Sequence, residues 1–424
     1  MKGTHKAMGV ILAVLLAILS MTGCEEEVTG AGTQTPAPDP QVLENYDADL
    51  AGASAAFGFD IFRELSSEEE NRMISPTSLY TALAMTLNGA RGETKDAMEG
   101  TLGVSGVERD RFNENNLARM YQLQEADPDV ILTIANSLWV REGEELDPEF
   151  VNRNQTYYHA LMRSLDFSSP QAADTINQWV SDRTEERIEK IVEPPINEMT
   201  ILFLINAVYF KGDWSEPFDE AMTEEDLFRT PAGGNVTVPF MVRRDEMAYH
   251  EEEELFQAVR LPYGSEERLA MYVFLPWEGQ TLTQLLEQLE ENRWNQWRRH
   301  FWERDGRLRL PRFTMAYEKA MNDVLKAMGM EPAFDEDRAD FFDMLPRDEG
   351  DGLFISEVKH KTFIEVNEKG TEAAAVTSVE MEATSAPPEE PFDMNVNRPF
   401  LFLIHDSELN EVLFMGTVVD PSVE

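Results

Sequence analysis

The sequence predicts an α+β fold in one large folded body, and three features of the 424-residue chain support this prediction. Apolar residues at helical spacing cluster early in the chain, whereas short, β-rich apolar runs dominate later. Residues 45–424 contain no linker, internal repeat or low-complexity block. Because helices and strands are segregated, the pattern favours α+β over alternating βαβ units. A body of this size is large for one core, so we expect two closely packed subregions.

Three segments are predicted to form amphipathic helices, at residues 48–66, 78–91 and 171–191. In each segment, apolar side chains recur at intervals of three or four residues and therefore lie on one helix face. Gly89 and Gly92 end the second helix, because glycine is a poor helix former.

Four short apolar runs are predicted to form strands, at residues 130–140, 201–210, 270–276 and 399–404. These runs are rich in residues that favour β-structure, and such continuous apolar runs fit strands buried in a core.

The N-terminal residues predict an export signal. Residues 1–23 combine two lysines, an apolar run and small residues, a pattern typical of a secretory signal peptide. The sequence LSMTGC at residues 19–24 resembles a bacterial lipobox, in which Cys24 is lipidated and becomes the new N-terminus. An ordinary signal cleaved nearby, with a spare cysteine, is the alternative. Residues 24–44, rich in acidic residues, Pro, Gly and Thr, are predicted to form a solvated tether before the domain at 45–424.

This N-terminal pattern predicts an exported protein. We expect a lipoprotein on the cell surface or facing the periplasm, or an extracellular protein, whose only membrane contact is the lipid anchor. No other stretch is long and apolar enough to cross a membrane.

The charge balance excludes one class of partner. The chain has 36 Lys and Arg against 80 Asp and Glu, a formal net charge of −44. Nucleic acid is not expected as a partner, because binding phosphates requires clustered Lys and Arg. We interpret the acid excess as a solubility device of a halophilic acidic protein, in which salt screens the self-repulsion, and we expect folding and activity to need salt.

The sequence offers no active site, so no catalytic residue, metal or cofactor is predicted and the protein is not expected to be an enzyme. A GxSxG elbow, a Walker loop, an HExxH motif and a GxGxxG turn after a strand are all absent from the sequence. The six histidines show no metal-ligand spacing, and the single cysteine excludes an internal disulfide. A cluster of acidic residues at 335–340 lacks the alternation of an EF-hand loop and is interpreted as a solvated turn.

The segment 371–383 alternates with a period of two residues. One set of alternate positions is small or apolar: Thr371, Ala373, Ala375, Thr377, Val379, Met381 and Ala383. The other set is mostly polar, so the segment could form a strand that buries one face. A helical interpretation of the run Ala373-Ala374-Ala375 fits the residues equally well. A proline-rich stretch at 385–391 follows, and it cannot lie in a central strand.

These residues resemble the serpins, the serine protease inhibitor superfamily. EKGTEAAAVTSV at 368–379 resembles the reactive-loop hinge of that family, and MNVNRPFLFLI at 394–404 resembles its C-terminal signature. NRMISPTSLYTALAMTLNGARGETKDAM at 71–98 and LINAVYFKGDWSEPF at 204–218 are similar to family segments in the same order. The resemblance covers residues 45–424.

The resemblance implies a fold and a mechanism. The fold is the serpin fold, with helices clustered mainly in the N-terminal half around a large mixed main sheet of five strands, smaller sheets, and an exposed reactive loop near the C-terminus. The mechanism is suicide inhibition of a serine protease, in which the cleaved loop inserts residues 371–383 into the main sheet and traps the covalent acyl-enzyme. A monomer without cofactor is expected.

Family spacing places the reactive bond at Thr384-Ser385, fourteen residues after Gly370. Cleavage after Thr384, or after Ala383, suits a protease with a small or aliphatic primary pocket, such as an elastase-like or subtilisin-like enzyme. A trypsin-like target is not expected, because no Lys or Arg lies between 370 and 397. Cleavage after Glu382 by a glutamate-preferring protease is an alternative.

Three groups of residues have mechanical roles in the resemblance. The hinge, where the loop leaves the body, comprises Glu368, Gly370, Thr371, Glu372, Ala373, Ala374 and Ala375. The shutter, a polar cluster beneath the main sheet, comprises Ser75, Pro76, Ser78, Asn206 and His360. The breach, where the loop first enters the sheet, comprises Trp214, Arg312 and Glu368, with an expected ion pair between Arg312 and Glu368.

Two other functions would require residues that the sequence lacks. A non-inhibitory serpin, acting as a surface binding or structural protein, would be favoured by bulky or charged residues on the inward face of the hinge, and that face has none. A secreted hydrolase would need a catalytic triad, which the sequence does not provide.

Overall fold

The computed structural model describes residues 36–65, 70–231, 233–346, 353–371 and 390–423. It contains the helices α1 (Pro40–Glu44), α2 (Ala48–Leu65), α3 (Pro76–Leu87), α4 (Gly92–Thr101), α5 (Arg109–Gln124), α6 (Pro148–Tyr158), α7 (Ala172–Arg183), α8 (Leu282–Glu287), α9 (Glu291–Trp297) and α10 (Asn322–Leu325). Seven of these ten helices precede residue 184, which confirms the expected clustering in the N-terminal half.

One sheet, called the main sheet below, has six strands. Their order is β10 (Phe313–Ala320), β11 (Lys359–Asn367), β12 (Gly370–Thr371), β4 (Leu202–Asp213), β2 (Val130–Arg141) and β3 (Leu161–Leu165). Only the β2–β3 pair is parallel, so the sheet is mixed, as the sequence led us to expect. Five strands were expected in this sheet, but it has six, because the two-residue strand β12 lies between β11 and β4.

The second sheet has nine strands. Its order is β1 (Arg72–Ile74), β15 (Glu411–Val418), β14 (Phe400–Asp406), β8 (Leu269–Pro276), β7 (Phe256–Pro262), β6 (Asn235–Glu252), β9 (Trp302–Pro311) and β13 (Phe392–Asn395), and β5 (Glu224–Arg229) pairs with β6. Strands β8, β14 and β15 are buried along their whole length. The second sheet therefore has more strands than the main sheet, and the two sheets together with the helices give the expected α+β serpin architecture.

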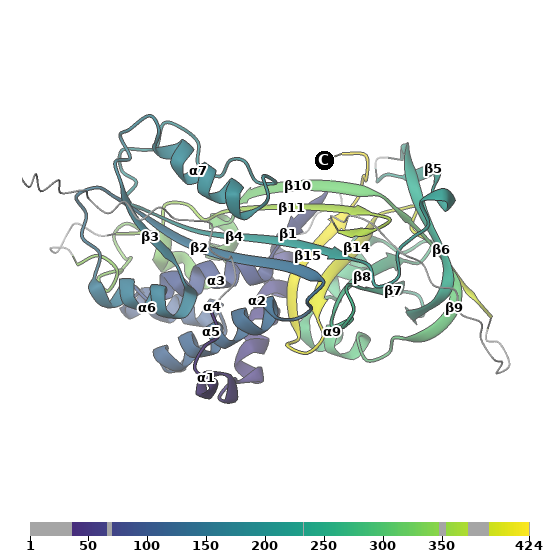
Figure 1. Cartoon of the computed structure of the whole chain (residues 1–424), viewed down its shortest axis with the longest axis horizontal. Helices are drawn as coiled ribbons and strands as arrows, with labels where there is room; N and C mark the ends of the chain where they lie inside the picture. Colours follow the sequence, from purple (N-terminus) through teal and green to yellow (C-terminus); the bar gives the residue numbers. More distant parts are fainter. Residues whose placement is uncertain (1–35, 66–69, 232, 347–352, 372–389, 424) are drawn as a thin grey trace, which may run out of the picture. The chain divides into compact units, whose positions relative to one another are not determined.

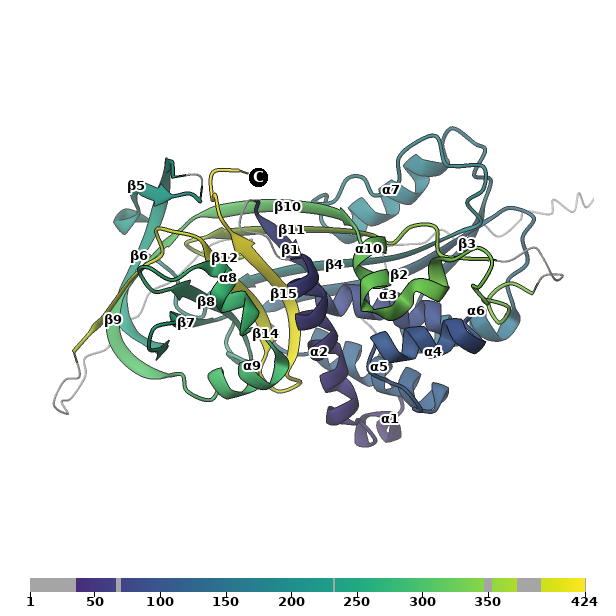
Figure 2. The ribbon, with the colours of Figure 1, turned by 180° about the vertical axis from the view of Figure 1, so that it is seen from behind.

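Helices cover both faces of the main sheet (Figures 1 and 2). Helix α3 lies against β4 on the face where α2, α5 and α6 also gather, and nearly all its side chains are buried. It begins sharply, because Pro76 occupies the first turn and the Ser75 hydroxyl accepts a hydrogen bond from the Ser78 N–H. On the opposite face, α7 packs Ile176 and Val180 against residues of β2 and β4.

The strands at 130–140, 201–210, 270–276 and 399–404 are confirmed as β2, β4, β8 and β14, and the helix at 48–66 as α2. The helix expected at 78–91 is α3, which begins at Pro76 and ends at Leu87. Two larger differences remain.

The third expected helix, at 171–191, is wrong in its second half. Helix α7 ends at Arg183, because Glu185 and Glu186 adopt the left-handed conformation, with φ angles of 47° and 63°. The chain then folds back on α7, and Ile188 is buried in the same core without being part of the helix.

The second difference concerns the tether. The last five residues of the expected solvated tether, Pro40–Glu44, form helix α1, which the Asp39 carboxylate caps. The boundaries of the signal peptide and tether stay predictions. Across the part of the chain that is described, no helix has the length and apolar character needed to cross a membrane.

Candidate functional site

The hinge begins inside the main sheet. Gly370 pairs with Asn367 on β11 and with Asp213 on β4, so β12 bridges the two longer strands. The φ angle of Gly370 is 153°, and a Cβ atom there would lie 2.2 Å from the Gly212 carbonyl oxygen. Only glycine therefore fits this position, which gives a physical reason for the residue at the start of the hinge.

Thr371 points into the core, as the alternating pattern predicted. Its side chain is buried, and its Oγ1 lies 2.8 Å from Oη of Tyr263. The Tyr263 ring stacks on Trp214, with ring centroids 4.5 Å apart and an angle of 17° between the planes. Burial raises the pKa of Tyr263 far above its usual value, so its hydroxyl stays protonated.

Glu368 lies at the turn between β11 and β12 and forms the predicted ion pair. Its Oε1 accepts hydrogen bonds from Arg312 Nε at 2.8 Å and from the Thr223 hydroxyl, and Arg312 Nη2 lies 2.5 Å away. The Glu368 side chain is only 3 % exposed. Burial alone would raise the pKa of Glu368, but the hydrogen bonds from Arg312 and Thr223 outweigh burial and hold it below its usual value.

Trp214, the third breach residue, fixes the same turn through its ring and its backbone. Its Nε1 donates to the carbonyl oxygen of Asn367 at 2.9 Å. Its backbone N–H donates to the carbonyl oxygen of Lys369 at 2.8 Å. The Phe218 N–H donates to the Glu368 carbonyl oxygen at 2.8 Å. The three predicted breach residues therefore lie together, around the point where the chain enters the sheet.

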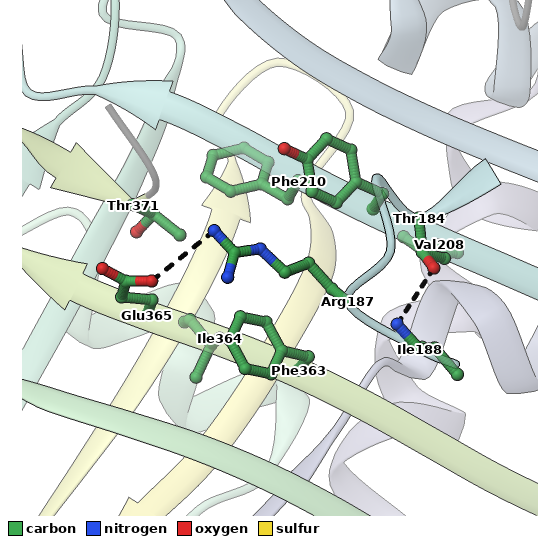
Figure 3. A pocket seen from close by; sticks show the side chains of 10 residues that line it. Thr184, Arg187, Ile188, Val208, Phe210, Phe363, Ile364, Glu365 and Thr371 are labelled. Atoms are coloured by element: carbon green, nitrogen blue, oxygen red, sulfur yellow. Dashed lines mark hydrogen bonds and ion pairs between the residues drawn. The ribbon is translucent and has the colours of Figure 1, made fainter. Parts of the chain in front are cut away.

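Beyond Thr371 the main sheet has an unpaired interval. Within the described residues, residues 359–365 of β11 pair only with β10. Residues 202–211 of β4 pair only with β2. A small pocket lies here, lined by side chains of both strands, by Thr371 and by the segment after α7 (Figure 3). We call this unpaired interval between β4 and β11 the slot.

Arg187, from the segment after α7, lies across the slot. Figure 3 shows its side chain extending from the α7 side toward Glu365 on β11, next to Thr371. Its Nη2 lies 3.7 Å from Glu365 Oε2, and its guanidinium lies 5.2 Å from the centroid of the Phe363 ring.

Part of the predicted shutter is assembled around His360. The Ser75 N–H donates to His360 Nε2 at 3.0 Å, while the Ser75 hydroxyl caps α3 next to Pro76 by accepting from the Ser78 N–H. Since His360 Nε2 accepts a hydrogen bond, the imidazole is neutral. Burial explains this state, because it lowers the pKa of His360 to about 3.

Asn206 belongs to a separate polar pair. Its Nδ2 donates to Asn136 Oδ1 at 2.6 Å, and Asn136 Nδ2 donates to the Tyr158 carbonyl oxygen at 2.8 Å. The pair therefore connects β4 through β2 to the end of α6. The structure divides the expected shutter into a group around His360 on β11 and a group around Asn206 on β4, one on each side of the slot.

Several site residues were missed by sequence reasoning: Tyr263, Thr223, Asn136, Arg187 and Glu365. Asn136 alone carried a usable signal, because an amide inside the apolar run at 130–140 needs a hydrogen-bond partner once that run is buried. The others are ordinary residue types that become neighbours only through tertiary folding.

Several predicted residues lie outside the described residues: Glu372, Ala373, Ala374, Ala375, Thr384, Ser385 and Cys24. Among the residues that are described, no three His, Cys, Asp or Glu side chains come together in a way that could hold a metal ion.

Comparisons with known proteins identify relatives along almost the whole chain. The family model described as "Serpin (serine protease inhibitor)" matches residues 52–421. An uncharacterized serpin-like protein of Thermococcus kodakarensis is 35% identical over 382 residues, which cover 89% of this chain and 87% of that protein. The human leukocyte elastase inhibitor is 34% identical over 388 residues, which cover 88% of this chain and 99% of that protein.

Solved structures show the same architecture. The native state of Tengpin, a thermophilic serpin, matches with a TM-score of 0.78 and 32% identity, covering 91% of this chain and 95% of that chain. Human thyroxine-binding globulin, solved in complex with thyroxine, also matches with a TM-score of 0.78, at 27% identity, covering 90% of this chain and 99% of that chain.

Proposed function

The chain belongs to the serpin family, and from this premise we propose that it inhibits serine proteases as a suicide substrate. Serpins are mostly protease inhibitors rather than catalysts, which supports inhibition as the activity. In the proposed reaction the protease serine oxygen attacks the carbonyl carbon of Thr384, and the bond to the Ser385 nitrogen breaks. Ser385 leaves as a free amine that takes up the proton, and an ester joins Thr384 to the protease.

The fate of this ester decides between inhibition and ordinary cleavage. Insertion of residues 371–383 between β11 and β4 adds a strand to the main sheet and carries the attached protease along. Thirteen residues span about 43 Å as a strand, at about 3.3 Å per residue. The displaced protease no longer completes hydrolysis, so the ester persists.

One observation supports this proposal above all others: the main sheet already contains Thr371, the first residue of the inserting segment, paired next to Gly370. Gly370 and Thr371 pair with both neighbours, and beyond them, among the residues that the structure describes, β11 pairs only with β10 and β4 only with β2. The side chain of Thr371 is buried in the core. The alternate positions that follow it, from 373 to 383, carry small or apolar residues.

The target we propose is an elastase-like or subtilisin-like serine protease. Thr384 and the neighbouring Ala383 present small side chains, which suit a small or aliphatic primary pocket. A relative named leukocyte elastase inhibitor, 34% identical to this chain, supports the same class. We further propose that the inhibitor acts outside the cytoplasm, anchored through a lipid on Cys24, on the grounds of the N-terminal sequence. The resemblance to the family supports a monomer.

The test incubates purified protein with pancreatic elastase, with subtilisin and, as a control, with trypsin. We expect a complex that survives SDS with elastase or subtilisin and none with trypsin. Mass spectrometry of the released C-terminal fragment should begin at Ser385; a different first residue would overturn the assignment of the reactive bond.

The alternative is a serpin that binds a ligand or a surface without inhibiting proteases. The similarity to thyroxine-binding globulin, solved with thyroxine bound, gives this alternative a structural precedent. Cleavage without an SDS-stable complex and without a gain in heat stability would favour it, because both effects depend on strand insertion.

A further inference from the structure

The Arg187 side chain lies across the slot that the inserting strand must fill. We propose that the contacts of Arg187 with Glu365 and Phe363 slow strand insertion. Arg187 thereby sets the fraction of cleaved inhibitor molecules that end in a covalent complex with the protease. This inference rests on the proposed function, because it concerns the rate of the insertion step.

The position of Arg187 follows from the turn that ends α7. The Thr184 carbonyl oxygen accepts from the Arg187 N–H at 2.8 Å, and the Thr184 hydroxyl accepts from the Ile188 N–H at 3.1 Å. The Glu186 N–H donates to the Ser181 carbonyl oxygen at 2.9 Å. Arg187 is therefore attached to α7, on one face of the main sheet, while its guanidinium reaches β11 (Figure 3).

The contacts lie in the path of the strand. Arg187, Glu365 and Phe363 line the same pocket as Thr371, the first residue of the inserting segment. On the other side of the slot, Val208, Tyr209 and Phe210 of β4 line this pocket. A strand that continues from Thr371 toward the far end of β11 must pair with the free edges of both strands. The guanidinium must leave this position before pairing can proceed.

The strength of the contact is modest and depends on salt. The Arg187 and Glu365 side chains are 39% and 35% exposed, so water and ions screen their attraction. The cation–π contact with Phe363 adds a contribution of similar size. Losing both contacts is expected to speed insertion about fivefold, a difference that changes how insertion competes with hydrolysis of the ester.

The test measures insertion without any protease. A synthetic peptide with the sequence of residues 372–383 is incubated with the full-length protein, and its uptake is followed by native gel electrophoresis and by the rise in unfolding temperature. At 0.1 M salt, Arg187→Gln is expected to take up the peptide about fivefold faster than the wild type, whereas Glu365→Gln keeps the contact of Arg187 with Phe363 and should be about twofold faster. The double variant should be no faster than Arg187→Gln, because that change alone already removes the contact with Glu365.

The matched control is Arg183→Gln. This substitution removes the same charge four residues earlier, where the guanidinium lies 5.9 Å from the Trp179 ring centroid on the α7 side. Its uptake rate should equal that of the wild type. In 1 M salt, where the screening length falls to about 3 Å, wild-type uptake should approach that of Arg187→Gln.

The outcomes separate this inference from the proposed function. Equal uptake by the wild type and by both slot variants, or equal acceleration by Arg183→Gln, would overturn the role of Arg187 while a wild-type complex with elastase or subtilisin leaves inhibition standing. With those proteases, the slot variants should also raise the fraction of cleaved inhibitor found in the covalent complex. Absence of both peptide uptake and a protease complex in every variant would overturn the inference and the proposed function together.

Discussion

The hydroxyl groups of Tyr263 and Thr371 meet in the core, with Tyr263 Oη 2.8 Å from Thr371 Oγ1 of the main sheet. Tyr263 is fully buried and stacks on Trp214, so the first inward residue of the hinge rests against a fixed aromatic surface. A larger or charged side chain at position 371 has no space there.

Thr371→Arg is therefore expected to convert the inhibitor into a substrate. The guanidinium would have to be buried without a partner beside Tyr263, at a cost of several kcal/mol, so the hinge would stay outside the sheet. The measurement is the fraction of cleaved protein in an SDS-stable complex, which should fall at least about tenfold. Thr371→Ser keeps the hydroxyl and should keep the complex. Retained complex formation by Thr371→Arg would contradict insertion at this position.

Gly370→Ala should release β12 from the sheet without protease. The added Cβ would lie 2.2 Å from the Gly212 carbonyl oxygen, and backbone atoms cannot move aside as a flexible side chain can. We expect amide hydrogen exchange of residues 366–371 to speed up at least about tenfold. Gly100→Ala in α4 is the matched control, because a Cβ there meets nothing within 4 Å. Unchanged exchange in Gly370→Ala would show that the sheet can accommodate the methyl group.

Arg312→Ala should destabilise the turn between β11 and β12. The substitution leaves the Glu368 carboxylate buried with the Thr223 hydroxyl as a remaining side-chain donor, and such a loss costs about 1–3 kcal/mol. The measurement is the urea concentration at the unfolding midpoint. Adding Glu368→Gln to Arg312→Ala should restore part of the loss, because the uncompensated charge is then removed. A double variant as unstable as the sum of the single variants would mean that the two residues act independently.

Stability should fall as the pH falls from about 6.5 to 3, because two histidines are buried in the neutral state. Burial lowers the pKa values of His360 and His405 to about 3. In the unfolded chain both histidines bind a proton below about pH 6.5, whereas in the folded chain they do not. The unfolded state therefore binds more protons, and the free energy of unfolding decreases by up to roughly 3 kcal/mol per pH unit for the two groups together.

The contribution of one histidine can be measured separately. His360→Gln removes one titrating group while its amide oxygen can still accept from the Ser75 N–H. We expect the pH dependence of the unfolding midpoint between pH 6 and 4 to become about half as steep. The same steepness in the variant would show that His360 is not neutral in the folded protein.

Arg119→Met should be among the most destabilising single changes in the helical region. Arg119 Nη1 lies 2.6 Å from Glu411 Oε1, and both side chains are almost completely buried between the helices and β15. Removing the cation leaves a buried carboxylate uncompensated, which costs about 3–5 kcal/mol. Lys359→Met breaks an exposed pair with Glu318 and should change stability by less than about 1 kcal/mol. Urea unfolding of both variants makes the comparison, and similar losses in the two would contradict this assignment.

The sequence predicted the elements whose pattern is local. The apolar run at 270–276 forms strand β8, which is buried on both faces. The end of α7 was predicted wrongly for a tertiary reason. Ile188 continues the helical spacing and is buried in the same core, but it reaches that core after the left-handed turn at Glu185 and Glu186. Periodicity cannot distinguish these two routes to burial.

The candidate site was predictable where the alternating pattern marks the inward side of Thr371 and where the family resemblance names residues. The Arg312–Glu368 ion pair was expected on that basis, and the structure contains it. Tyr263 and Arg187 were not expected, because one is a tyrosine in a turn and the other an arginine after a helix, far in sequence from Thr371 and Glu365. Their importance comes from distances that only the folded chain defines.

The two-residue strand β12 has a consequence for the kinetics of strand growth. Starting a strand between two others requires several residues to lose conformational freedom before any ladder hydrogen bond forms, and this initiation is the slow, entropically costly step. Because Gly370 and Thr371 are already paired, growth from Thr371 would need only propagation, in which each further residue extends an existing end. Propagation also has a fixed register and a fixed direction, since the next residues can add only beyond Thr371.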